Sequence, residues 1–410
     1  MGRRSIWVTF TITLAVSIAL SIAEGSSPKV DAETGRIRIM HFGAGAFPSR
    51  VYPYDPMFKF AWVPAYMFGM GREEVQRSLR IYMPRSYSLL VENDVLVFDD
   101  TCASNYRDLW LVWCRDGVLK DKLGLVMMAG GESFGGVEGH GIGYIGTSLE
   151  ELLPVQMYHQ MTWDLTHLPN YSLPWEITDK NHVLTQALPY DAAPVLGPQN
   201  FVTEKQGAHT LAMAKEVPGR NQKWPVWTYA DIEESRTMAF TAYMWESRHG
   251  LQRFDLWEYF LDHVSNMLYY TCRLEIPDDL QMVHQIRDSF REYVTRKVFA
   301  HNLMEFIQRF GANTQRLELR IEDSDKLKKE AEHLYVGQEY QASYDMIQEA
   351  ISEMKEIALD SGDLKKAALM WVYVTEYLTV SGTCMATGFI LWTLMVRRKL
   401  YRAVATTRAA

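Results

Sequence analysis

Cysteine is scarce in this chain, with four residues in 410. A disulfide framework requires a much higher density of cysteine. Cys384 lies in an apolar run and Cys114 in a segment with a helical pattern, so only Cys102 and Cys272 remain as a possible pair. We interpret these two as buried thiols rather than a disulfide. The sequence also lacks a fixed-spacing metal motif such as His-Glu-x-x-His, and we predict no cofactor.

Basic residues are too few for a protein that binds nucleic acid. Lys and Arg number 42 against 50 Asp and Glu, which gives a net charge of −8. Seven of the basic residues lie at the two ends: Arg3, Arg4, Arg397, Arg398, Lys399, Arg402 and Arg408. Without them, 35 basic residues face 50 acidic ones, a balance of about −15. Such a surface repels a phosphate backbone, and we predict no nucleic-acid partner.

Charge is absent from two long apolar runs. The first, residues 6–23, follows two arginines and ends in Ser21, Ile22 and Ala23. We interpret residues 1–23 as a secretory signal, with an uncleaved signal anchor as the alternative. The second run, residues 377–396, is long enough to cross a bilayer. We therefore predict a transmembrane helix at residues 371–396, with Trp371 among its interfacial aromatic residues.

The position of positive charge predicts the orientation of this span. The tail at residues 397–410 is basic, and positive charge marks the cytoplasmic side of a membrane. We expect a single-pass protein of the cell membrane, with its large N-terminal part extracytoplasmic. Asn170 begins an Asn-x-Ser triplet and is a candidate glycosylation site in an exported chain.

Apolar segments between residues 36 and 128 alternate with helical patterns. Residues 36–42, 94–100 and 123–128 are predicted strands, and residues 73–82 and 104–117 are predicted helices, the second capped by Ser104. Residues 50–56 are a loop interrupted by proline. This alternation is typical of an α/β fold, a parallel sheet covered on both faces.

Shorter elements follow this alternation. The third strand runs into the glycine turn after Ala129, and a short helix is expected to begin at Thr147 or Ser148. Residues 181–189, 208–214, 225–229 and 236–242 are predicted strands, and residues 254–270 a closing helix. Aromatic residues gather in this part, and core packing is favoured over a carbohydrate-stacking platform: Trp224, Trp227, Tyr229, Tyr243, Trp245, Trp257 and Tyr259.

Residues 276–366 have the pattern of a helical stalk. Apolar residues from Val283 to Val298 recur at helical spacing, and two further helices turn at residues 336–338. The last carries a stripe with alternating spacings of four and three: Tyr340, Tyr344, Ile347, Ile351, Met354 and Ala358. We expect this stripe to pack against another helix, in this chain or in a second copy. The predicted partners are therefore the lipid bilayer and protein, or self-association through the stalk.

Several short motifs, taken in order, carry a resemblance to a known family. They include residues 81–87, 94–100, 130–135 and 143–155, followed by residues 182–185, 227–229 and 238–242. In this order they resemble the putative glutamine amidotransferase branch of the class I glutamine amidotransferase-like families. The resemblance implies a flavodoxin-like parallel-sheet domain at residues 36–272. The signal, stalk and span also resemble a group of archaeal membrane-anchored proteins of unassigned function.

The catalytic residues of that family do not carry over. Glutamine hydrolysis requires a thiolate on a strand-to-helix turn, with a histidine and a carboxylate behind it. The turn here has Ala129. Ser133 has the outline of a Gly-x-Ser-x-Gly motif but lies beyond the turn, and Cys102 would be a displaced nucleophile. We therefore predict a non-catalytic domain that acts in binding or assembly.

An enzyme remains the alternative. Asp99, Asp100 and Cys102 follow the second predicted strand, whereas Glu132, Ser133 and Glu138 follow the third, together with His140. The carboxyl ends of neighbouring parallel strands share one crevice, where these side chains could bind a polar ligand or a metal. On this alternative the protein is an extracytoplasmic hydrolase or amidase that uses Asp99, Asp100, Glu132 and His140.

Overall fold

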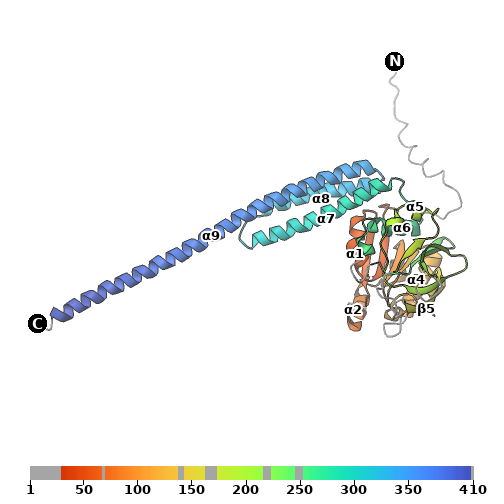
Figure 1. Ribbon diagram of the computed structural model, residues 1–410, viewed down its shortest axis with the longest axis horizontal. Helices are drawn as coiled ribbons and strands as arrows, with labels where there is room; N and C mark the ends of the chain where they lie inside the picture. Colours follow the sequence, from red (N-terminus) through yellow and green to blue (C-terminus); the bar gives the residue numbers. More distant parts are fainter. Residues whose placement is uncertain are drawn as a thin grey trace, which may run out of the picture. The chain divides into compact units, whose positions relative to one another are not determined.

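The computed structural model describes residues 29–66, 70–136, 143–161, 173–215, 223–244 and 253–407 (Figure 1). The predicted signal at residues 1–23, Glu138, His140, Asn170 and Trp245 lie outside these ranges. The chain divides into two compact units, Met1–Arg287 and Asp288–Ala410. Each is described by itself.

The first unit is an α/β domain built on a mixed eight-stranded sheet, in the order β2-β1-β3-β4-β10-β9-β8-β6. Strands β2, β1, β3, β4 and β10 are parallel, and β9, β8 and β6 continue the sheet by antiparallel pairing. The strands are β1 (Ile37–Gly43), β2 (Phe58–Pro64), β3 (Val95–Asp99), β4 (Gly124–Met128), β6 (Trp175–Ile177), β8 (His209–Ala214), β9 (Pro225–Ile232) and β10 (Ser235–Phe240). A separate antiparallel pair joins β5 (Val155–Met161) to β7 (Asn200–Glu204).

Helices cover both faces of this sheet, as the alternating burial of β1 demonstrates. Ile37 and Ile39 belong to one buried cluster with α6, and Met40 and Phe42 belong to a second cluster with α2 and α4. Because side chains alternate across a strand, two clusters on one strand mean two covered faces. The helices are α1 (Ala46–Arg50), α2 (Arg72–Tyr82), α3 (Tyr87–Leu90), α4 (Asp108–Asp121), α5 (Val183–Gln186) and α6 (Phe260–Thr271).

Some local predictions were wrong. The segment predicted as a strand at residues 181–189 contains helix α5, because the Nδ1 atom of His182 accepts a hydrogen bond from the backbone N–H of Leu184 and caps a helical turn. Ser104 lies in a short 3-10 helix, Ala103–Asn105, and α4 begins only at Asp108. The short helix expected at residue 147 or 148 is a 3-10 turn, Glu150–Leu152.

The second unit is a bundle formed by the rest of α7 (Leu280–Gln308), with α8 (Gln315–Val336) and α9 (Tyr340–Thr407) (Figure 1). Helix α9 runs antiparallel to α8, and the Ser343 hydroxyl donates to the Ala331 carbonyl at 2.7 Å. Its predicted stripe is the core of this bundle, since Ile347, Ile351 and Met354 are fully buried. The stripe is therefore covered within this chain.

The last helix of the stalk continues into the predicted span, and together they form α9, one helix of 68 residues. Apolar side chains cover the later part of α9 and are exposed, among them Trp371, Leu378 and Phe389. This helix is long and apolar enough to cross a membrane, by length and composition.

Candidate functional site

Strands β3 and β4 end side by side at the carboxyl edge of the sheet. Asp99 is paired in register with Met128, so the turns after the two strands face each other. Asp100 begins the first turn with a left-handed backbone, φ 44°. One of its carboxylate oxygens, Oδ1, accepts a hydrogen bond from the backbone N–H of Glu132 at 3.2 Å. The two groups predicted to share a crevice therefore come together through this contact.

The glycine turn after β4 is filled by side chains from distant parts of the chain. The Asn200 side chain accepts from the N–H of Gly130 at 3.1 Å and donates to its carbonyl at 3.0 Å. The Tyr243 hydroxyl accepts from the N–H of Gly131 at 2.6 Å and donates to Asp100 Oδ2 at 3.0 Å. Three successive N–H groups, from residue 130 to residue 132, thus bind side chains of the protein itself.

This packing leaves no room for a side chain at residue 130. A Cβ atom added to Gly130 would lie 1.8 Å from Asp100 Oδ1, far inside van der Waals contact. Glycine is therefore required by the close approach of Asp100, not by an unusual backbone angle. We call His41, Asp99, Asp100, Asn200 and Tyr243 the edge cluster.

Asp99 and His41 form the other half of the edge cluster. His41 lies on β1, and its Nε2 atom is 2.7 Å from the Ala44 carbonyl, so it carries the proton and donates. Its Nδ1 atom then accepts from the Tyr52 hydroxyl at 2.9 Å. The Asp99 carboxyl lies 3.6 Å from His41 Nε2, and neither of its oxygens has a hydrogen-bond partner among the described residues.

Burial determines the ionisation of this pair. Burial, with the nearby charge of Asp100, raises the pKa of the Asp99 carboxyl well above its usual range. Burial likewise lowers the pKa of His41 to about 3. Both shifts favour the uncharged form of the side chain. His41 is poorly suited to act as a base, because its two nitrogens are already engaged.

The other predicted site residues that the structure describes are buried near this edge. Cys102 has its sulfur 2.9 Å from the Ser104 hydroxyl, and none of the four cysteines, all of which lie in the described ranges, forms a disulfide. Glu132 and Ser133 are buried too, and the Ser133 hydroxyl has no partner among the described residues. Among the residues that the structure describes, no cluster of three or more His, Cys, Asp or Glu side chains could hold a metal ion.

Sequence reasoning missed the residues that complete the edge cluster. Tyr243 was noted only as one of several aromatic residues, and His41 and Asn200 were not noted at all. A local signal was available only for His41, a polar residue in the middle of an apolar strand. The core interpretation of the aromatic group is confirmed for its buried members, which include Trp224, Trp227 and Trp257.

Comparison with known proteins identifies the domain. Residues 85–272 match the model of the family described as putative glutamine amidotransferase. The chain carries a glutamine amidotransferase-like domain. No curated protein matches the sequence.

Several solved structures are similar to part of this chain. The cytoplasmic protein STM1381 from Salmonella typhimurium LT2 is 21% identical, with a TM-score of 0.44, over 57% of this chain and 99% of that one. The cytoplasmic protein STM3548 from Salmonella typhimurium is 17% identical, with a TM-score of 0.44, over 57% and 98%. A ThuA-like protein from Parabacteroides merdae is 9% identical, with a TM-score of 0.37, over 60% and 94%.

Proposed function

We propose that this protein is a membrane-anchored, non-catalytic member of the glutamine amidotransferase-like group, which acts in binding or assembly outside the cytoplasm. Helix α9 anchors it, and the α/β domain is the part that recognises a partner. The main observation behind this proposal is that side chains of the protein itself bind the backbone N–H groups of the turn after β4.

An acyl-transfer site needs backbone N–H groups that are free to bind a developing oxyanion. Here the N–H groups of Gly130, Gly131 and Glu132 bind Asn200, Tyr243 and Asp100. The turn also lacks a thiol, since residue 129 is alanine. Both requirements for glutamine hydrolysis, a nucleophile and an oxyanion site, are therefore unmet at this turn.

Anchoring is supported by the composition of α9. Its apolar part is exposed, and a cluster of basic residues begins at Arg397. Exposed apolar surface of this extent is costly in water and favourable in lipid. The basic cluster supports a cytoplasmic C-terminus, with the α/β domain on the other side.

Catalysis is tested by ammonia release from glutamine, with full-length protein purified in detergent. We expect no release above the blank, and the same result for Cys102→Ser. Release by the native chain that is lost in Cys102→Ser would overturn the proposal, because it would assign Cys102 as a displaced nucleophile.

Topology is tested with a membrane-impermeant maleimide on intact cells. The background is Cys384→Ser, since the other three cysteines are buried. Lys326→Cys lies on an exposed position before the span and should be labelled. Tyr401→Cys, also exposed, lies beyond the span and should react only after permeabilisation. The reverse pattern would refute the extracytoplasmic location.

A further inference from the structure

We infer that the turn between α7 and α8 is a second membrane-contacting element, which inserts the rings of Phe306 and Phe310 into the surface of the bilayer that α9 crosses. This inference rests on the membrane anchoring proposed above. We call residues 306–314 the stalk tip.

The register of the bundle places the stalk tip beside the start of the span. The Gln348 side chain on α9 donates to the Ser289 hydroxyl on α7 at 2.8 Å, across 59 residues. The Lys365 ammonium lies 5.2 Å from the centre of the Phe306 ring, at the same sequence offset. The two helices are therefore parallel and in constant register.

This register assigns a depth to the stalk tip. An offset of 59 residues puts Phe310 level with Leu369, two residues before Trp371. With a rise of about 1.5 Å per residue, Phe310 lies about 3 Å from the level of Trp371 and about 12 Å from that of Tyr377. The stalk tip is thus at the depth of the aromatic residues expected at the outer membrane interface.

The side chains at this depth suit an interface. Phe306 and Phe310 have exposed fractions of 39% and 38%, and their ring centres are 4.9 Å apart. On α9 the neighbouring residues Met370, Trp371 and Tyr373 are more than half exposed. Aromatic side chains concentrate at the boundary between headgroups and acyl chains, where an apolar face is buried by several ångströms. Both helices therefore expose apolar side chains at this depth.

Charge balance indicates how the stalk tip binds lipid. Between residues 305 and 318, Arg309 and Arg316 are offset by Glu305 and Glu318, and Arg309 is ion-paired with Glu305 at 2.6 Å. On the neighbouring part of α9, Lys365 and Lys366 are offset by Asp360 and Asp363. A surface with no net charge gains little from anionic headgroups. We therefore expect burial of the phenylalanine rings to dominate, and the contact to be insensitive to salt and to the fraction of anionic lipid.

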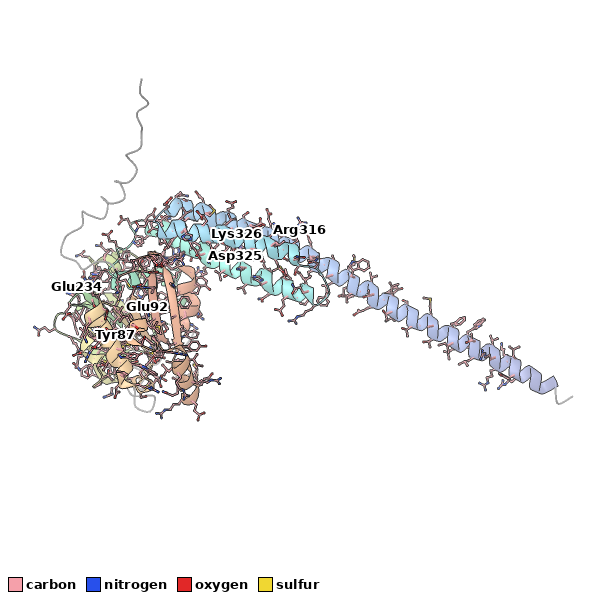
Figure 2. The ribbon with its side chains drawn as sticks, turned by 180° about the vertical axis from the view of Figure 1, so that it is seen from behind. Tyr87, Glu92, Glu234, Arg316, Asp325 and Lys326 are labelled. Atoms are coloured by element: carbon pink, nitrogen blue, oxygen red, sulfur yellow. The ribbon has the colours of Figure 1, made fainter. Side chains whose placement is uncertain are left out.

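The contact can be measured in nanodiscs that each hold one full-length chain in the Cys384→Ser background. An environment-sensitive fluorophore is attached at Ala312→Cys in the stalk tip, and its quenching by lipids with nitroxide-labelled headgroups is recorded. The control positions are Lys326→Cys on the exposed side of α8 and Leu378→Cys in the span. Figure 2 labels Lys326 and also Arg316 in the first turn of α8, nearer the stalk tip.

We expect headgroup quenching at residue 312, little at residue 326, and quenching by acyl-chain nitroxides at residue 378. Phe306→Ser combined with Phe310→Ser should remove most of the quenching at residue 312. Phe299→Ser is the matched control, because this ring is 59% exposed but lies about 16 Å before Phe310 along the helix axis. It should leave the quenching unchanged.

The outcomes separate the two proposals. Quenching at residue 378 without quenching at residue 312 would overturn the stalk-tip contact and leave the membrane span intact. Absence of quenching at residue 378 would refute the span itself, and the stalk-tip contact with it. A change at residue 312 only in discs that hold two chains would assign the surface to a second copy, which also overturns the inference.

Discussion

Replacing Asp99 by asparagine tests the ionisation of the edge cluster. Asparagine keeps the shape of the side chain and removes the titrating proton. Burial raises the pKa of Asp99 well above its usual range in the folded protein, whereas an aspartate in an unfolded chain has a pKa of about 3.9. Between these two values the folded state holds one proton that the unfolded state has released.

The sign of the effect follows from this difference in bound protons. For a carboxyl whose pKa is raised by folding, the contribution to stability is full below the unfolded pKa and is lost as pH rises toward the folded pKa. Asp99→Asn does not undergo this loss. Its free energy of unfolding relative to the native chain should therefore rise as pH increases above the unfolded pKa, by at most about 1.4 kcal/mol per pH unit, which is the slope for one proton.

Urea unfolding of the full-length protein in detergent micelles measures this difference at pH 5, 6 and 7. Tryptophan fluorescence reports on the α/β unit, where Trp224, Trp227 and Trp257 are buried. Asp31→Asn is the control: the Thr34 hydroxyl lowers the pKa of this carboxyl, so the difference should be flat over the same range. A flat difference for Asp99→Asn would refute a raised pKa for Asp99.

Two further substitutions test packing. Gly130→Ala should lower the free energy of unfolding in urea by about 1–3 kcal/mol, because its Cβ would meet Asp100. Gly71→Ala is the control and should not destabilise the fold, since a Cβ there has no atom within 4 Å. Equal effects of the two substitutions would contradict the packed turn. Ile347→Asp combined with Ile351→Asp should cost at least several kcal/mol, because both side chains are fully buried in the stalk; an unchanged thermal melt, followed by circular dichroism, would show that the stripe is exposed.

The sequence allowed correct prediction of elements with a strong local pattern. Strands β1, β3 and β4 are nearly continuous apolar runs with sharp ends, as a sheet covered on both faces requires. Strand β2 was missed although Lys59 is the one charged residue in its apolar sequence; because it lies at the sheet edge, its residues from Lys59 to Trp62 are exposed. Helix α5 was missed because a four-residue helix has no period to detect.

The candidate site could be predicted only in part. That Asp100 and Glu132 approach each other follows from strand order, since both residues come just after neighbouring parallel strands. The contact of Tyr243 with Asp100 joins residues 143 positions apart, and that of Asn200 with Gly130 joins residues 70 positions apart. Such pairings depend on how later strands return to the sheet, and no local pattern encodes them.

The hydrogen bonds that fill the turn after β4 limit how this domain can bind a ligand. A ligand at the turn after β4 would have to displace Asn200, Tyr243 and Asp100 from three backbone N–H groups, and it would have to replace every hydrogen bond that it breaks. A buried group left unpaired costs about 1–3 kcal/mol, so three such losses would cancel much of the binding energy of a small substrate. The turn is therefore better suited to rigidity than to turnover, and recognition by this domain is expected on its outer surface.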